Sequence, residues 1–449
     1  MFNNKKILVL GMARSGYEAA KLLISMNNQV ILNDKNDNQN SDHVQELKKL
    51  GIEVILGEHP KNLIDQTFDY IVKNPGVPLN HVYVIEAEKY NIPVINEVEL
   101  AFHLLPQDIN IIGITGSNGK TTTTTIIYEI LKKANFSVHL MGNIGFPVSS
   151  FVKKVKPKDT IVMEVSIQQL CNVNKFKTNM AVLTNLYEAH LDFVGSYQNY
   201  INIKKRIFNY HTSRDVAILN SDNEDVIKIT NDISSEKLYF STQKETNSDS
   251  YIKDNAIYYY NNKIIDISDI KIKGIHNYEN IMAAIIVAKK LNVSDKLIQE
   301  VLKTFNGVEH RIEFIKEING INFYNDSKST NIKATQIALS SFYNDTILLL
   351  GGLDRGHSFE GLKSYLNHVK SIIAYGETKE RIKAFAESRA IKCLVVETLD
   401  EATQEAYKIA GPQNIVLLSP ACASWDQFKD FEERGRKFKE IVNKLELKG

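Results

Sequence analysis

The segment Thr115-Gly-Ser-Asn-Gly-Lys-Thr121 carries residue types that bind nucleotide phosphates. The branched apolar run before it predicts a buried strand, and the amphipathic run from Lys120 to Ala134 predicts a helix. Between such elements, glycines let backbone N–H groups approach phosphate oxygens, and the helix N-terminus adds partial positive charge. Lys120 can reach the terminal phosphates, and the Thr121 hydroxyl can hold Mg²⁺. The candidate residues for ATP or GTP phosphates are Gly116, Ser117, Asn118, Gly119, Lys120, Thr121 and Thr122.

This loop departs from the usual phosphate-loop pattern, because Ile114 stands where the first glycine is expected. The alternative is a tight strand-to-helix turn with an exposed lysine. The apolar strand before the loop and the helix after it favour phosphate binding.

Two further strands deliver possible metal ligands to the same edge of the predicted sheet. Glu164 lies near the end of the strand predicted at 160–165, and His190 follows the strand predicted at 180–184. A carboxylate and an imidazole beside a nucleotide are plausible metal ligands. Each taken alone is also explained as an exposed strand-end acid or a loop histidine, and their shared position favours function.

Residues 5–34 predict a β-α-β unit, with a glycine turn at Gly11–Gly16 and a helix at Tyr17–Met26. Such a turn can take a phosphate, and Asp34 at the end of the second strand can bond a sugar or base. The pattern is incomplete, since position 13 is alanine. It does not choose between NAD and a UDP-sugar. The Pro/Gly loop around Gly76 follows another strand and is either a ligand loop or a rigid turn.

Residues 231–272 predict antiparallel hairpins that form an accessory flap. The helix predicted at 197–210 carries Lys204, whose spacing alone indicates a solvated helix face. Asn277 and Asn280 share one face near the start of a helix, where exposed capping is the alternative to ligand binding.

In the last third of the chain, three predicted strands are each followed by a polar loop. These loops are residues 325–331, 351–356 and 419–431. The carboxyl ends of strands form the ligand edge of such sheets. Lys328 and Arg355 add positive charge there, which suggests an anionic substrate. The β/α alternation predicts a mostly parallel sheet with helices on both faces.

The fold class is therefore α/β, with three domains: a Rossmann-like domain at 1–98, a phosphate-loop ATPase-like domain at 99–307 and a second Rossmann-like domain at 308–449. The net charge of +1 gives no support for nucleic-acid or membrane binding. The three cysteines are far apart and fit a reducing compartment. The N-terminal residues lack a secretion-signal apolar region, so we expect a cytoplasmic protein.

The order and spacing of these motifs resemble the Mur ligases over essentially the whole chain. These are ATP-dependent amino-acid ligases of peptidoglycan precursor synthesis, and so of cell-wall formation, cell shape and division. The segments Asp326–Asn331 and Ser419–Phe428 resemble the branch that adds D-glutamate. The resemblance implies that UDP-N-acetylmuramoyl-L-alanine is activated by ATP as an acyl phosphate and then attacked by the amine of D-glutamate, with ADP and phosphate as products.

The resemblance also implies a set of site residues. Catalytic roles fall on Lys120, His190 and Lys204. Two magnesium ions are implied, one bound by Thr121 and Glu164 and the other by His190 and a carbamylated Lys204. Further ATP contacts are Asn277, Asn280, His310, Arg311 and Asp326. The UDP-linked substrate is expected at Arg14, Ser15, Asp34, Gly76 and Asn143. D-Glutamate is expected at Lys328, Thr330, Arg355, Ser424 and Phe431.

One departure from the family pattern is the presence of Ile167 and Gln168 where relatives often carry a serine and an aromatic residue. Hydroxyl contacts at these positions are therefore not expected. The alternatives are a related ligase for another amino acid or for folate, and an NAD-dependent oxidoreductase built on Gly11–Asp34. The latter leaves the Lys120 loop unexplained. We expect a monomer.

Overall fold

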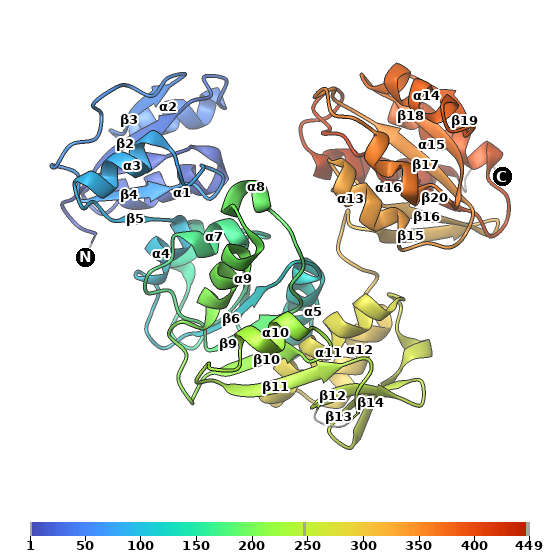
Figure 1. The fold of residues 1–449 in the computed structure, drawn as a ribbon, viewed down its shortest axis with the longest axis horizontal. Helices are drawn as coiled ribbons and strands as arrows, with labels where there is room; N and C mark the ends of the chain where they lie inside the picture. The colour runs from blue at the N-terminus through green and yellow to red at the C-terminus, as the bar shows by residue number, and fades with distance from the viewer. Residues whose placement is uncertain (1, 246–247, 446–449) are drawn as a thin grey trace. The chain divides into compact units, whose positions relative to one another are not determined.

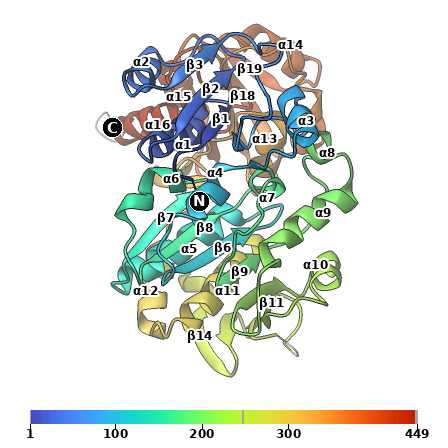
Figure 2. The same cartoon turned by 90° about the vertical axis from the view of Figure 1, so that its left-hand side faces the viewer.

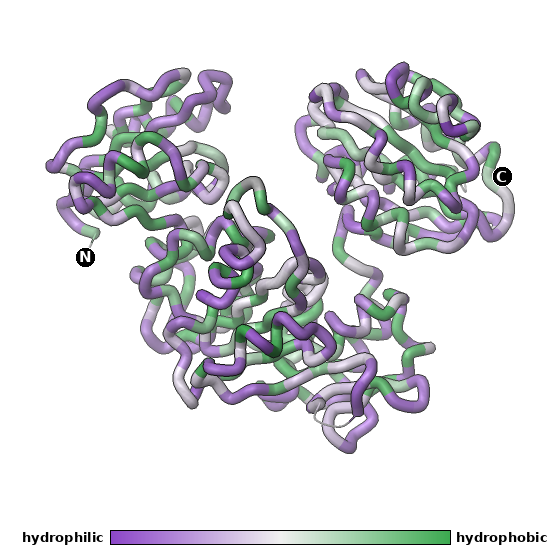
Figure 3. The backbone as a smooth tube through the Cα atoms, viewed as in Figure 1, coloured by the Kyte–Doolittle hydropathy of each residue, from purple (hydrophilic) through white to green (hydrophobic). Residues whose placement is uncertain are grey.

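The computed structural model describes residues 2–245 and 248–445, and the chain divides into two compact units, Met1–Phe305 and Asn306–Gly449. Within the described residues, the first unit holds a five-stranded and a nine-stranded sheet, and the second unit holds a six-stranded sheet (Figure 1). Hydrophobic segments run along the strands of each sheet, and many of the connecting loops are hydrophilic (Figure 3).

The five-stranded sheet is parallel throughout, in the order β3-β2-β1-β4-β5. Alternating side chains of β1 serve two cores. Ile7 and Val9 pack with α1 and α2, and Leu8 and Leu10 pack with α3. The elements are β1 Lys6–Leu10, α1 Ala13–Ile24, β2 Gln29–Asp34, α2 Ser41–Lys49, β3 Glu53–Leu56, β4 Tyr70–Lys73, α3 Val82–Lys89, β5 Val94–Ile95 and α4 Glu97–Phe102.

Helix α1 begins at Ala13, four residues before the predicted start at Tyr17. The polar residues Arg14 and Ser15 therefore lie in its first turn rather than in a loop. Their side chains do not join the core, so the helical spacing of apolar residues begins in the sequence only at Tyr17.

The nine-stranded sheet has the order β14-β13-β12-β11-β10-β9-β6-β8-β7 and is parallel from β7 to β12. Strands β7, β8, β6 and β9 follow one another in Figure 2. Its first part contains β6 Asn110–Thr115, α5 Lys120–Lys133, β7 Val138–Gly142, α6 Val148–Phe151, β8 Thr160–Glu164, α7 Ile167–Cys171, β9 Met180–Leu183, α8 Leu191–Val194, α9 Tyr197–Lys205 and β10 Val216–Asn220. Its second part contains α10 Glu224–Ile229, β11 Glu236–Ser241, β12 Ser250–Lys253, β13 Ala256–Tyr259, β14 Asn262–Asp266, α11 Ile275–Lys290 and α12 Asp295–Thr304.

The prediction of a separate antiparallel flap at 231–272 was partly wrong. Strand β11 follows a helical crossover through α10 and pairs in parallel with β10. Only the β12–β13–β14 meander is antiparallel, and it extends the central sheet. Residues 246 and 247 of this segment lie outside the described part of the chain.

The sheet of the second unit has the order β15-β16-β20-β17-β18-β19. Leu348 and Leu350 on β17 pack into one core with α13 and α14, and Ile347 and Leu349 pack into the opposite core with α15 and α16. The elements are β15 Glu313–Ile318, β16 Ile321–Asn325, α13 Ile332–Leu339, β17 Thr346–Gly351, β18 Val369–Tyr375, α14 Lys379–Glu387, β19 Lys392–Val395, α15 Leu399–Ile409, β20 Ile415–Leu418 and α16 Phe431–Leu445.

Edge strand β15 is antiparallel to β16 and was not predicted. The two strands are joined by Asn319-Gly320, and both residues have positive φ angles of 51° and 77°. An Asn-Gly pair between apolar runs is a strong hairpin signal, so the sequence did contain this information. In the described part of the chain, the helices are all too short or too polar to cross a bilayer.

Candidate active site

The loop between β6 and α5 is shaped by two glycines that no other residue could replace without strain. Gly116 and Gly119 have φ angles of 141° and 81°. A Cβ atom on Gly116 would lie 2.0 Å from Oγ1 of Thr184, and one on Gly119 would lie 2.2 Å from Oδ1 of Asn280. The loop therefore has no side chain at these two positions and packs closely on Thr184 and Asn280, as a phosphate-binding loop requires.

Neighbouring strands hold this loop in place. The Asn118 N–H donates to Oδ1 of Asn185 at 2.8 Å, and the Thr184 hydroxyl donates to the Asn118 carbonyl at 2.6 Å. The Ser117 hydroxyl is 2.8 Å from the Tyr200 hydroxyl on α9. The Lys120 ammonium lies over the loop and donates to the carbonyls of Gly116 and Ser117, at 2.9 and 2.8 Å. Lys120 is thus positioned beside any anion that the loop binds.

The first turn of α5 places the Thr121 side chain beside the loop, where it is buried, and Thr122 is half-buried beside it. Helix α11 contributes Asn280, which is also buried and accepts a hydrogen bond from the Thr123 hydroxyl at 3.1 Å. Asn277, one turn earlier, is half-buried and donates to the Lys273 carbonyl at 2.8 Å. Asn280 therefore supports the loop directly, whereas Asn277 bonds to the backbone just before its own helix.

Glu164 is the last residue of β8 and lies beside the loop. In the sheet it is opposite Ile114 on β6 and Gly142 on β7. Its side chain is 2% exposed. The Asn143 side chain donates to Oε1 of Glu164 at 2.6 Å, and the Asn143 N–H donates to the Glu164 carbonyl. Asn143, which was predicted to contact the UDP-linked substrate, also orients this carboxylate.

Lys204 is buried at 1% exposure, contrary to the solvated face that its spacing indicated. Its ammonium donates to Oγ1 of Thr115 at 2.9 Å and lies 5.6 Å from the centre of the Tyr200 ring. Burial and, secondly, the charge of Lys120 lower the pKa of Lys204 well below its ordinary value, while Glu164 opposes this shift. Lys204, Lys120 and Glu164 therefore share one electrostatic environment.

His190 lies at the N-terminus of α8, in the connection that follows β9. Its backbone is left-handed, with φ of 54°, and its side chain is exposed. The fold thus brings the end of β6, the end of β8 and the loop after β9 to one edge of the sheet, as expected for a parallel arrangement.

The chemistry of these donors fits a magnesium ion. Thr121 offers a hydroxyl oxygen and Glu164 a buried carboxylate, and Mg²⁺ prefers such hard oxygen ligands. The imidazole of His190 is a softer ligand, and an ammonium at Lys204 is not a ligand at all. Lys204 fits the second expected ion, beside His190, only if carbamylation converts its amine into a carboxylate-like group.

A second cluster of predicted residues forms at the strand ends of the five-stranded sheet. The Asn74 side chain donates to the Ser15 hydroxyl at 2.8 Å and accepts from the Gly76 N–H at 3.0 Å. Asp34 accepts from the Met12 N–H at 2.7 Å. Ser15, Asp34 and Gly76 therefore line the same edge, around the turn between β1 and α1.

Arg14 connects this edge with the nine-stranded sheet. Its guanidinium donates to the Gly145 carbonyl at 3.0 Å, in the loop that follows β7. Because Asn143 lies in the same loop, Arg14 and Asn143 stand on neighbouring segments of the first unit, which is where one extended substrate could contact both.

The departure at Ile167 and Gln168 leaves the start of α7 intact. Ser166 accepts from the Gln169 N–H, and the Gln169 side chain accepts from the Ser166 N–H, which forms a complete capping box. Ile167 is buried at 1% exposure and joins the core. Position 167 therefore contributes apolar packing rather than the hydroxyl that the family pattern predicts there.

In the second unit, Asp326 follows β16 and is buried. The Ser419 hydroxyl donates to its Oδ2 at 2.7 Å, and the Ile312 N–H donates to its Oδ1 at 3.2 Å. Burial raises the pKa of Asp326 to about 6, although these hydrogen bonds and the charge of Arg311 oppose the shift. Arg311 itself is exposed.

His310 is buried beside the same strand. Its Nδ1 lies 2.9 Å from the Asn325 amide nitrogen, and its carbonyl accepts from the Lys328 N–H at 3.0 Å. Its ring packs edge-on against Phe431, with centroids 6.2 Å apart. The ammonium of Lys328 lies 5.7 Å from the centre of the Phe431 ring. Two predicted D-glutamate residues, Lys328 and Phe431, are thus brought together beside His310.

Thr330 lies two residues after Lys328, and its N–H donates to the Lys328 carbonyl at 2.9 Å. Ser424 is buried at 2% exposure, in the loop after β20. Arg355, in the loop after β17, lies over the ring of Trp425 at 4.6 Å. The three strand-end loops predicted from the sequence therefore carry all five candidate residues.

Arg434 is a residue that the sequence interpretation missed. It is fully buried on α16 and joins two of these loops. Its guanidinium donates to the Ser327 hydroxyl and carbonyl, at 3.0 and 2.9 Å, and to the Cys422 carbonyl at 3.1 Å. An arginine in a charged helix predicts an exposed side chain, so the sequence offered no signal for this role.

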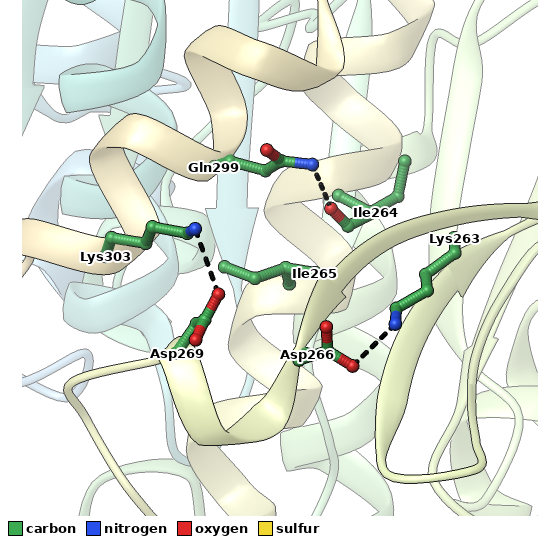
Figure 4. A pocket seen from close by; sticks show the side chains of 7 residues that line it. All are labelled: Lys263, Ile264, Ile265, Asp266, Asp269, Gln299 and Lys303. Carbon is green, nitrogen blue, oxygen red and sulfur yellow. Dashed lines mark hydrogen bonds and ion pairs between the residues drawn. The ribbon is translucent and has the colours of Figure 1, made fainter.

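A pocket of about 190 Å³ lies apart from these residues, between β14, the turn that follows it and α12 (Figure 4). Its polar groups pair with one another. Lys263 pairs with Asp266 at 2.7 Å, Lys303 pairs with Asp269 at 2.9 Å, and Gln299 donates to the Ile264 carbonyl. The pocket is thus an ion-paired surface hollow with none of the predicted site residues.

Three family models match the chain in succession. They are the MurD-like N-terminal domain of Mur ligases at residues 5–96, the Mur ligase middle domain at 114–288 and the Mur ligase glutamate ligase domain at 310–422.

Curated relatives match over nearly the full length. The UDP-N-acetylmuramoylalanine–D-glutamate ligase of Geobacillus kaustophilus is 43% identical over 446 residues, which cover 99% of this chain and 98% of the relative. The protein of the same name from Bacillus cereus strain G9842 is 43% identical over 445 residues, with the same coverage.

Solved structures share the fold at low sequence identity. The UDP-N-acetylmuramate-alanine ligase MurC of Thermotoga maritima has a TM-score of 0.59 and 18% identity, covering 98% of this chain and 100% of its own. The MurF ligase of Thermotoga maritima, solved in complex with ADP, has a TM-score of 0.57 and 16% identity, covering 99% and 96%.

Proposed function

The chain belongs to the Mur ligase family, and from this premise we propose that it joins D-glutamate to UDP-N-acetylmuramoyl-L-alanine, forming ADP and phosphate in peptidoglycan precursor synthesis. The observation that carries the proposal is the 43% identity, over 99% of the chain, to relatives named for this reaction. The family is one of ATP-dependent ligases, which replaces the alternative of an NAD-dependent oxidoreductase. We further propose the domain limits 1–98, 99–307 and 308–449, cytoplasmic location and a monomeric enzyme.

The reaction begins with attack of the alanyl carboxylate on the γ-phosphorus of ATP, which forms an acyl phosphate and releases ADP. The amine of D-glutamate then attacks the acyl carbon, loses a proton and expels phosphate as the amide forms. Little covalent help from the protein is needed, because the difficulty lies in bringing anions together and neutralising their charge.

The phosphate loop and Lys120 are suited to that task. Phosphate oxygens are proposed to accept from the backbone N–H groups at the start of α5, beginning at Gly119, because those of Ser117 and Asn118 already donate to Asn185. The Lys120 ammonium stabilises the negative charge that develops on the transferred group. Asn280 supports the loop from α11. The strand-end cluster of Arg14, Ser15, Asp34 and Gly76, with Asn143, is proposed to hold the UDP-linked substrate.

One magnesium ion is proposed at Thr121 and Glu164 and a second at His190 with Lys204, and when bound they would neutralise phosphate oxygens as Lewis acids. Lys204 is proposed as a carbamylated ligand. Its buried environment favours the neutral amine, which is the form that adds to CO₂ with release of one proton. The carbamate then carries the negative charge that the neighbouring Lys120 ammonium stabilises.

In the second unit, His310, Arg311 and Asp326 are proposed to contact ATP. Lys328, Thr330, Arg355, Ser424 and Phe431 are proposed to hold D-glutamate. Support comes from the three strand-end loops that carry the D-glutamate candidates, two of which Arg434 joins, and from the cationic character of Lys328 and Arg355.

The test is phosphate release with ATP, Mg²⁺ and UDP-N-acetylmuramoyl-L-alanine, offering D-glutamate, L-glutamate, L-lysine and meso-diaminopimelate separately. We expect release with D-glutamate alone, together with a product of the matching mass. Lys120→Ala should lower the rate on the order of 10²-fold or more, whereas Lys132→Ala, at an exposed position on the same helix, should leave the rate unchanged. Release with a different amino acid would refute the substrate assignment.

A further inference from the structure

The chain's one tryptophan, Trp425, lies beside a residue of the proposed D-glutamate site. The guanidinium carbon of Arg355 is 4.6 Å from the centre of its ring. Trp425 is 63% exposed, which is unusual for the largest apolar side chain. Burying core surface does not explain such a residue, so its contact with Arg355 calls for another reason.

The two loops that carry these side chains are fixed to each other. Leu353 and Ala423 form an antiparallel bridge, in which the Leu353 N–H donates to the Ala423 carbonyl at 3.0 Å. A Cβ atom on Gly352 would lie 2.3 Å from that same carbonyl, so the loops approach as closely as glycine allows. The stacking of Arg355 on Trp425 is therefore built on a rigid base.

The loop around Arg355 is also held from its other side. Arg381 pairs with Asp354 and donates to the His357 carbonyl at 2.8 Å. The Asp354 side chain accepts from the Gly356 N–H at 2.8 Å. Arg355 thus stands at the tip of a loop whose backbone is pinned on both sides, while its own long side chain would be free to rotate without the indole.

Stacking gives that side chain a direction. A guanidinium attracted to an aromatic face uses its flat surface, and its N–H donors remain in the plane for a carboxylate. A guanidinium that is already oriented can form two parallel hydrogen bonds with a carboxylate. The arginine side chain then loses less conformational entropy on binding.

We propose that Trp425 is a specificity-determining residue for the amino-acid substrate, because its indole holds the Arg355 guanidinium ready for one carboxylate of D-glutamate. This inference rests on the proposed function, in which Arg355 meets that substrate. Trp425 acts through Arg355 and is a positioning residue. Its neighbour Ser424 is buried and belongs to the same loop.

The test compares Trp425→Leu, Trp425→Phe, Arg355→Gln and the double variant Trp425→Leu/Arg355→Gln in the complete enzyme. Trp425→Leu should raise the KM for D-glutamate about tenfold, with the KM for ATP and for the UDP-linked substrate unchanged. Trp425→Phe keeps an aromatic face, so its KM for D-glutamate should lie between those of the wild type and Trp425→Leu. The double variant should be no worse than Arg355→Gln alone, since both changes remove the same interaction. Tyr343→Leu, at an 83% exposed aromatic residue of the same unit, is the matched control and should behave as wild type.

Two substrate analogues identify the contact. D-Glutamine lacks the γ-carboxylate and D-isoglutamine lacks the α-carboxylate. The Trp425→Leu effect should disappear with one of them and persist with the other. Three results would overturn the inference while leaving the proposed function intact. They are a Trp425→Leu effect that persists with both analogues, a multiplicative loss in the double variant, and a wild-type KM for D-glutamate in Trp425→Leu. A wild-type enzyme that turns over without accepting D-glutamate would instead refute the proposed function.

Discussion

Lys204 and Lys205 are adjacent on α9 and have opposite surroundings. Lys204 is buried against Thr115, whereas Lys205 forms an ion pair at the surface with Asp232 at 2.6 Å. If Lys204 carries a carbamate that holds metal, Lys204→Ala should lower the rate on the order of 10²-fold or more, and short carboxylic acids should restore part of it. Steady-state phosphate release measures both effects.

Lys205→Ala is the control for this pair and should retain full activity, because exposed ion pairs contribute little. A Lys204→Ala enzyme that turns over normally would remove Lys204 from the mechanism. A variant that is inactive and indifferent to added acids, yet folded, would exclude the carbamate and leave a packing role.

Asp326 makes a second prediction at the residue scale, on stability against pH. Its folded pKa of about 6 exceeds the ordinary 3.8, so the native state binds the proton more tightly than the unfolded chain. The ionised carboxylate therefore costs stability above pH 6, and this cost vanishes below the unfolded pKa. The interval from 3.8 to about 6 corresponds to roughly 3 kcal/mol.

Asp326→Asn cannot ionise, so the variant should gain stability relative to wild type as pH rises from about 4 to about 7, by up to roughly 3 kcal/mol. Urea unfolding followed by the fluorescence of Trp425, in the same unit, reports this difference. If the difference in unfolding free energy between the two proteins stays constant across this pH range, the pKa of Asp326 is not raised in the folded protein.

Among the elements, Gly119 of the phosphate loop can be compared with Gly51, a glycine of similar φ outside the loop. Gly119 has φ of 81° and no room for a Cβ, whereas Gly51, after α2, has φ of 88° and nothing within 4 Å. Gly51→Ala should cost about 1 kcal/mol of unfolding free energy from strain alone, with normal kinetics. Gly119→Ala should in addition raise the KM for ATP, because Asn280 and the loop must move apart. Equal kinetics in both variants would contradict the role given to the loop.

Much of the element order could be predicted from the sequence, because buried parallel strands are continuous apolar runs and each is followed by a polar loop. Strands β6, β8, β9, β17 and β20 were predicted in this way within a residue or two. Since such strands place their carboxyl ends at one edge, the grouping of Glu164 with the phosphate loop also followed from the sequence.

What the sequence could not give depends on contacts between distant residues. The burial of Lys204 depends on Thr115 and Tyr200, and the role of Arg434 depends on carbonyls of residues 327 and 422. Periodicity assigns a charged helical residue to the surface, because that is its commonest place. The parallel pairing of β11 was likewise hidden, since a strand's direction depends on the crossover that precedes it.

At the scale of the whole molecule, each unit has its own hydrophobic cores. Those of the second unit draw on both faces of its sheet and include α13 to α16. Residues 306–449 expressed alone should therefore fold, with cooperative unfolding detected by Trp425 fluorescence. Residues 1–305 alone should bind ATP weakly and form no product. An unfolded 306–449 fragment would show that its core depends on the rest of the chain.

The path of oxygen from the UDP-linked substrate distinguishes the proposed acyl-phosphate reaction from any other use of ATP. With ¹⁸O in the alanyl carboxylate and with ATP and D-glutamate present, acyl-phosphate formation transfers one ¹⁸O into each inorganic phosphate, because the carboxylate oxygen leaves with the phosphoryl group. We predict ADP, singly labelled phosphate and the D-glutamyl amide in equal amounts. Label appearing in AMP, or unlabelled phosphate released without amide, would contradict the account.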